Sequence, residues 1–151
     1  MINDIIDSLM STVTQATGLR TVELSDSPPA PCAMIYVDDI ASAEGYYRAM
    51  KGGVVTIPFI IEAVQPTVVP RTAARALNDL ISPFGPKSIP VAILEHPTAG
   101  QSGTEDTAAA GVSWTLKVES VTDYGYATSG EGNRYLRAKV NVSAMITRGS
   151  N

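Results

Sequence analysis

The clearest pattern in the chain is an alternation of apolar and polar positions near its C-terminal end. In residues 112–119, and again in 136–146, every second residue is apolar and the residues between are mostly polar. This period of two is typical of β-strands with one buried face. The phase changes at Ser120 and Val121, which predicts a β-bulge. Since the glycine-rich stretch "GYATSGEGN" between the two runs has the composition of a turn, the pattern predicts a long hairpin.

Two other segments carry apolar residues at helical spacing. Residues 2–13 place their isoleucines, leucine, methionine and valine on one stripe, with Asn3 as a candidate N-cap and Gly18 as the end of the helix. The segment "PRTAARALNDLIS" begins at Pro70, a residue suited to a first helical turn, and is stopped by prolines and a glycine after Ile81. Two amphipathic helices are therefore predicted.

Three further segments predict strands. They are "CAMIYVDD" at 32–39, "VVTIPFIIEAVQ" at 54–65 and "SIPVAILEH" at 88–96. The second is apolar on both faces as far as Glu62, which indicates a central strand, although Pro58 implies a bulge or an edge at that point. The element order predicts a single α+β domain over residues 1–151. We expect a mainly antiparallel sheet of about five strands with two helices packed on one face.

Composition and charge exclude some classes of function. The chain has 151 residues, 44% of them hydrophobic, a net charge of −4 and a pI near 4.9, which argues against a protein that grips nucleic acid backbone. The single cysteine, Cys32, cannot form an internal disulfide. The N-terminal segment lacks the basic region of a signal peptide, and the longest apolar stretch is too short to span a bilayer. We expect a soluble protein, made in a cytoplasm, without a membrane partner.

The residue types that could act in catalysis or bind a metal do not occur in the combinations that such sites need. His96 has no second ligand nearby in the sequence, and Cys32 starts an apolar strand, where a buried small side chain is expected. The acidic pairs at 38–39 and 105–106 suit turns and solubility better than catalysis. We therefore expect no catalytic residue, no cofactor and no metal site.

Three groups of residues are candidates for a partner interface instead. The first is the loop 96–111, which contains no large hydrophobic residue, so a partner could order it or it could be a tolerated surface loop. The second is a tyrosine-rich turn that could equally be a packed loop. The third is the basic face of the last strand, which could also be solvated. The candidates are Thr98, Gln101, Glu105 and Asp106, then Tyr46, Tyr47 and Arg48, and finally Arg134, Arg137 and Lys139.

Taken together, the segments resemble the tail terminator proteins of long-tailed (siphovirus-type) bacteriophages. The resemblance is carried by the N-terminal amphipathic helix, by "PCAMIYVDD" and by "GGVVTIPFIIEAVQP" running into "VPRTAARALNDLIS". The C-terminal end, "WTLKVESVTDYGY…GEGNRYLRAKVNVSAMI", adds a Trp-led strand, a "DYG" turn and a Tyr-led return strand. The likeness covers nearly the whole chain and is one of architecture, without a catalytic motif.

The resemblance implies a structural virion protein and not an enzyme. Such proteins form a homo-oligomeric ring, usually a hexamer, that caps the tail tube, ends its polymerisation and provides the surface on which the filled head docks. The implied partners are the tail-tube protein and a head-completion or neck protein, with phage DNA passing through the lumen. The protein would be assembled in the bacterial cytoplasm and end in the tail or neck of the virion.

Two alternatives stay open at this point. The chain could be a neighbouring phage protein, such as a head–tail connector or a tail-tube subunit. It could also be a small cytoplasmic enzyme or ligand-binding α+β domain, which would require a concave pocket with clustered titratable groups.

Overall fold

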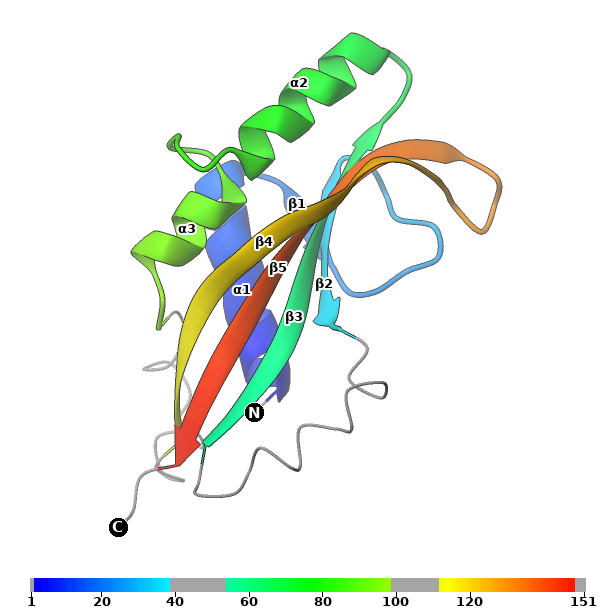
Figure 1. Cartoon of the computed structure of the whole chain (residues 1–151). Helices are drawn as coiled ribbons and strands as arrows, with labels where there is room; N and C mark the ends of the chain where they lie inside the picture. The colour runs from blue at the N-terminus through cyan, green and yellow to red at the C-terminus, as the bar shows by residue number, and fades with distance from the viewer. Residues whose placement is uncertain (1, 39–53, 99–111, 149–151) are drawn as a thin grey trace.

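The computed structural model describes residues 2–38, 54–98 and 112–148. They form a five-stranded sheet with three helices on one of its faces (Figure 1). The elements in chain order are α1 (Ile2–Thr17), β1 (Arg20–Val22), β2 (Cys32–Val37), β3 (Val54–Pro66), α2 (Pro70–Ile81), α3 (Ile89–Glu95), β4 (Val112–Thr128) and β5 (Arg134–Arg148). The predicted α+β class is confirmed.

The sheet has the strand order β1-β2-β3-β5-β4. Only the pairing of β1 with β2 is parallel, and the other three pairings are antiparallel. The central strand β3 pairs with β5 along its whole length, from Val54 opposite Thr147 to Pro66 opposite Tyr135. The two edge strands of the sheet differ in length, since β1 has three residues and β4 has seventeen.

The helices divide the covered face among them. α1 contacts β1 and β2, α2 contacts β3 and β5, and α3 contacts β4. α1 ends where Gly18 takes a positive φ of 74°, and its N–H donates to the Thr14 carbonyl. α2 begins with Pro70 in its first turn, as the sequence predicts. Asn3 lies inside the first turn of α1 and is not its N-cap.

The prediction of a strand at 88–96 is wrong, because these residues form α3. The Ser88 side chain accepts a hydrogen bond from the Val91 N–H at 3.2 Å, and Pro90 suits the first turn of a helix. A short, continuously apolar run fits a buried strand and a buried helix equally well, so periodicity alone cannot separate them. The fifth strand is instead β1, a short element that the sequence pattern did not reveal.

The sequence predicts irregularities at two points of the sheet, one in β4 and one at Pro58 of β3. The register of β4 against β5 shifts between Val118 and Ser120, which confirms the predicted bulge, and it shifts again between Thr122 and Gly125. Pro58 lies in β3 without a bulge, since its pairing with β5 is continuous. The Pro58 carbonyl accepts a hydrogen bond from the Asp38 N–H, and Asp38 is the residue just after the end of β2. The side of Pro58 that lacks an N–H donor therefore faces the end of β2, where the loss of one strand-to-strand hydrogen bond is tolerated.

The main core lies between the sheet and the helices. It is built from the alternating positions of β3, β4 and β5 together with Ile5, Leu9 and Leu77 of the helices. A second, smaller cluster lies on the opposite face, which we call the helix-free face, and consists of Cys32, Met34 and Val64. Ala30 of the connector between β1 and β2 packs against this cluster, and near the hairpin tip the Gly130 N–H donates to the Asp26 carbonyl of the same connector at 2.8 Å.

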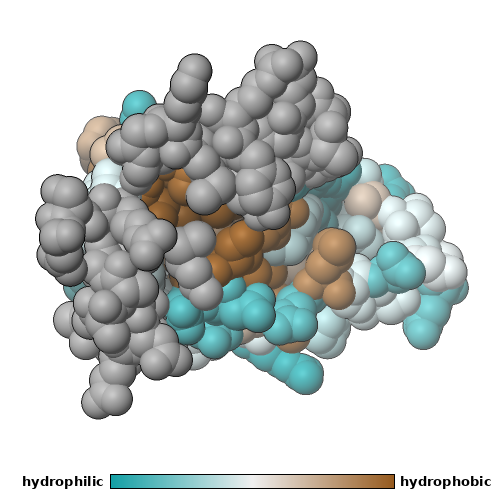
Figure 2. Space-filling model, turned by 90° about the horizontal axis from the view of Figure 1, so that it is seen from below, coloured by the Kyte–Doolittle hydropathy of each residue, from teal (hydrophilic) through white to brown (hydrophobic). Residues whose placement is uncertain are grey.

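The two ends of the sheet differ in shape. At the upper end the β4–β5 hairpin curves away from the helices and projects beyond them (Figure 1). Viewed from below, hydrophobic residues are visible at the surface at the other end of the molecule (Figure 2). Among the described residues, none of the helices is long and apolar enough to cross a membrane.

Candidate interaction surfaces

The helix-free face of the sheet brings together two of the predicted interface residues. Arg137 and Lys139 point to this face from β5, together with Asn141 and Ser143, because alternate residues of a strand share a face. Lys139 is not free in solvent, since its Nζ lies 3.7 Å from Asp123 Oδ2. Asp123 reaches this position from the second β4 bulge, where its φ is 58°. The predicted basic face is therefore partly neutralised by the chain itself.

A buried hydrogen bond lies next to these cations. The Tyr36 hydroxyl donates to Glu62 Oε1 at 2.8 Å, and Glu62 is only 5% exposed. Burial raises the pKa of Tyr36, and the hydrogen bond to the neighbouring carboxylate raises it further. Hydrogen-bonded in this way, the Glu62 carboxylate is tolerated in the middle of an otherwise apolar strand.

Arg137 lies beside this pair, opposite Val64 of β3 and Gly125 of β4. Its Nε is buried and has no hydrogen-bond acceptor among the described residues. Its positive charge lowers the pKa values of Tyr36 and Tyr135, but burial and Glu62 outweigh that effect and both pKa values are raised. The pair and Arg137 therefore place polar groups directly beside the small apolar cluster, since Tyr36 packs against it and Arg137 lies opposite its Val64.

Cys32 is completely buried in the small cluster, as predicted. Burial raises the pKa of its thiol from 9.0 to about 11. At pH 8 we expect the native thiol to react with a disulfide reagent at least about 100-fold more slowly than the thiol of urea-unfolded protein, because the thiolate is the reactive form. Equal rates in the two states would contradict this burial.

The raised pKa of Cys32 also makes the stability of the fold depend on pH under alkaline conditions. The folded state holds the thiol proton more tightly than the unfolded state, whose pKa is near 9.0. Between about pH 9 and pH 11 the native state therefore binds more protons, so the free energy of unfolding falls as the pH rises through this window. The contribution is fully present below pH 9.

The part of the helix-free face over β4 and β5 is polar and internally hydrogen-bonded. Asn141 Nδ2 donates to both Ser120 and Thr122, at 3.1 and 2.8 Å, and the Ser143 hydroxyl donates to Glu119 at 2.7 Å. Lys117 lies 3.9 Å from the same glutamate. A surface whose polar groups already pair with each other gains little by pairing with a partner.

The end of the β4–β5 hairpin exposes aromatic side chains, unlike the polar part of the helix-free face. The Arg134 guanidinium stacks over the Tyr126 ring, 3.8 Å from its centroid, and the Tyr124 hydroxyl donates to Asn78 Oδ1 of α2 at 3.0 Å. Both tyrosines are about half exposed. Arg134 thus lies on the helix side of the sheet, apart from Arg137 and Lys139, so the structure does not join the three cations into one basic face.

The remaining predicted residues are placed as follows. Thr98 is exposed just after α3, next to Pro97, whose carbonyl accepts from the Leu116 N–H of β4 at 2.6 Å. His96 is the exposed residue that caps the end of α3. The other candidates lie outside the described residues: Tyr46, Tyr47 and Arg48, and Gln101, Glu105 and Asp106.

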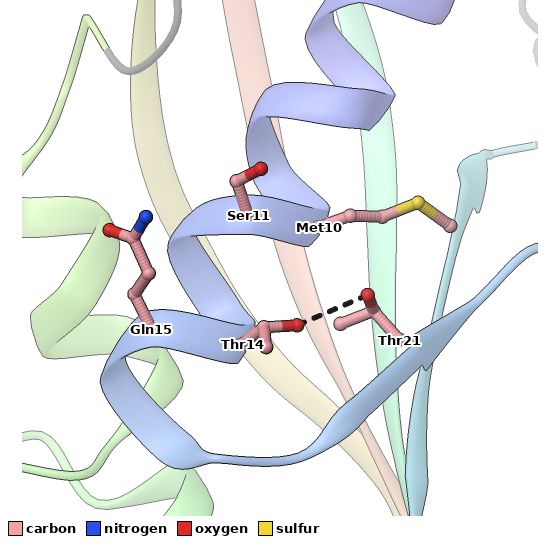
Figure 3. A pocket seen from close by; sticks show the side chains of 5 residues that line it. All are labelled: Met10, Ser11, Thr14, Gln15 and Thr21. Carbon is pink, nitrogen blue, oxygen red and sulfur yellow. Dashed lines mark hydrogen bonds between the residues drawn. The ribbon is translucent and has the colours of Figure 1, made fainter.

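The described residues do not form a reactive site elsewhere on the molecule. A shallow hollow of about 260 Å³ between α1 and β1 is lined by Met10, Ser11, Thr14, Gln15 and Thr21 (Figure 3). The Thr14 and Thr21 hydroxyls are 3.2 Å apart and hydrogen-bond to each other, and the lining contains no titratable side chain. Within residues 2–38, 54–98 and 112–148, no group of three His, Cys, Asp or Glu side chains could hold a metal ion.

Comparisons with known proteins do not assign the chain to a family. No protein-family model matches it, and a search of curated protein sequences finds no significant relative.

Proposed function

We propose that the chain is a structural subunit of a long-tailed bacteriophage, and specifically the tail terminator. In this role several copies, six in the usual case, form a ring on the last ring of the tail tube. The ring stops polymerisation, offers a docking surface to the neck protein of the filled head, and lets DNA pass through its lumen. The protein would be assembled in the bacterial cytoplasm and retained in the tail or neck of the virion.

The observation that carries the proposal is the projecting β4–β5 hairpin. Its strands have 17 and 15 residues, and its end curves away from the helix layer (Figure 1). Tyr124 and Tyr126 near this end are 48% and 50% exposed. Exposed tyrosines beside an arginine are typical of protein interfaces, and here the Arg134 guanidinium stacks over the Tyr126 ring. A net acidic subunit also suits a channel that DNA crosses without adhering.

The test is to measure the mass of the purified chain by light scattering and to image the same sample by negative-stain electron microscopy. We expect closed rings of about six subunits that bind the ends of tail tubes assembled without this chain. Open-ended tubes formed by the chain alone would instead identify a tail-tube subunit. A monomer or dimer that does not bind tail tubes would contradict the proposal and favour the small ligand-binding domain.

A further inference from the structure

The connector between β1 and β2, residues 23–31, forms part of the cover over the small apolar cluster on the helix-free face. Ala30 of the connector and Tyr135 of β5 both pack against this cluster. The three side chains of the cluster, including Cys32, are at most 2% exposed. Two segments that are far apart in the sequence therefore close over the same apolar surface.

Few hydrogen bonds hold the connector in place. It contains three prolines, which have no N–H to donate, and two of its hydrogen bonds are internal, within residues 25–27 and 28–30. Among the residues that the structure describes, a single hydrogen bond joins the stretch 24–30 to another element. It runs from the Gly130 N–H at the hairpin tip to the Asp26 carbonyl, over 2.8 Å.

The hairpin tip is shaped for a close approach to the connector. Its turn is closed by the N–H groups of Gly132 and Asn133, which donate to the carbonyl and the hydroxyl of Ser129. Gly130 is thus the second residue of the turn. A Cβ at this position would lie 3.3 Å from the Asp26 Cβ, so glycine lets the two backbones come within hydrogen-bonding distance.

We propose that the connector is a strap, which opens and closes over the small cluster while the sheet stays folded, and that the hairpin tip holds it closed. Segments with few buried contacts and few hydrogen bonds open locally before the core unfolds. A molecule that displaces the tip would therefore release the strap and uncover apolar side chains on the helix-free face. The device belongs to the single chain and does not depend on the proposed ring.

Cys32 can report the opening, because its thiol is completely buried when the strap is closed. The experiment is alkylation of the full chain with iodoacetamide at pH 8, at urea concentrations below the unfolding transition, with the modified Cys32 peptide measured by mass spectrometry. Opening of a strap exposes little surface, so the labelling rate should hardly depend on urea. Labelling through global unfolding would instead rise steeply with urea.

Two variants shift the strap in opposite directions. Gly130→Pro removes the N–H that donates to Asp26, and proline suits this position because it is favoured as the second residue of a β-turn and the φ of Gly130 is not positive. Asp26→Cys combined with Gly130→Cys allows a disulfide, since the two Cβ atoms would lie 3.3 Å apart and the usual distance is about 3.8 Å. Glu131→Ala is the matched control, because it changes an exposed side chain of the same turn.

We expect Gly130→Pro to label Cys32 at least about fivefold faster than the wild type, and the oxidised disulfide variant at least about fivefold more slowly. Glu131→Ala should stay within about twofold of the wild type. Circular dichroism in urea checks that the unfolding midpoints agree. Labelling that rises with urea as steeply as global unfolding would overturn the inference, and so would equal rates in the wild type and Gly130→Pro. If Gly130→Pro does not fold, the disulfide variant decides, and a rate equal to that of the wild type then overturns the strap.

Discussion

Replacing Trp114 with alanine is expected to lower the free energy of unfolding by about 3–5 kcal/mol. Trp114 is 1% exposed, lies opposite Ile146 in the β4–β5 pairing and belongs to the main core. The truncation removes a large buried apolar area and leaves a cavity that the surrounding strands cannot fill without distortion. Because typical domains have only about 5–15 kcal/mol of stability, the loss would be a large share of the total.

The measurement is urea unfolding followed by far-UV circular dichroism, since the substitution removes the only tryptophan and with it the fluorescence signal. Thr115→Ala is the matched control, because the neighbouring residue of the same strand is exposed on the other face. It should change the stability by less than about 0.5 kcal/mol. A Trp114→Ala variant within about 1 kcal/mol of the wild type would show that the strand is not packed as described.

Replacing Tyr36 with phenylalanine is expected to cost about 1.5–3 kcal/mol of stability. The change removes only the hydroxyl that donates to Glu62 Oε1, and it leaves a carboxylate that is 5% exposed without this donor. Water cannot readily replace the lost hydrogen bond at a site with so little solvent contact, so the desolvation cost of the carboxylate is no longer offset.

Tyr124→Phe provides a matched comparison for this loss. It also removes a tyrosine hydroxyl that donates to a side-chain oxygen, at 3.0 Å from Asn78, but Tyr124 is 48% exposed and solvent can take over the bond. The expected cost is below about 0.5 kcal/mol. If the two substitutions cost the same in urea unfolding, the Glu62 carboxylate is not buried in the way the structure describes.

The sequence predicted best the parts of the fold where a long pattern repeats. The alternation in β4 and β5 extends over many residues, so both strands, their buried faces and the first bulge could be recognised. α1 and α2 could also be recognised because their apolar stripes occupy three turns or more. The segment 88–96 is too short for its period to be measured, and its helix depends on the Ser88 cap and on packing against β4 and α1. β1, with three residues, gives almost no pattern of its own.

The interaction surfaces were less accessible to sequence reasoning because they depend on register. Arg134, Arg137 and Lys139 are near neighbours in the sequence, but the alternation of β5 places Arg134 on the helix side and the other two on the helix-free face. Tyr36 and Glu62 meet only because β2 and β3 pair in one particular register. The signal for that pair was Glu62 itself, the only charged residue in the apolar stretch 54–65.

The pairing of the central strand also determines the order in which the sheet can form. The turn between β4 and β5 joins Thr128 to Arg134 locally, whereas β3 pairs with β5 residues roughly 70–90 positions further along the chain, which is slow because long loops must close. We therefore expect refolding to protect the hairpin amides from hydrogen exchange before those of β3. Simultaneous protection of both would contradict this order.

Until β3 docks, the hairpin exposes the edge of β5 and the apolar residues that β3 later covers. During synthesis in the cell this interval is when the chain is most prone to aggregate, so assembly would depend on folding being completed first.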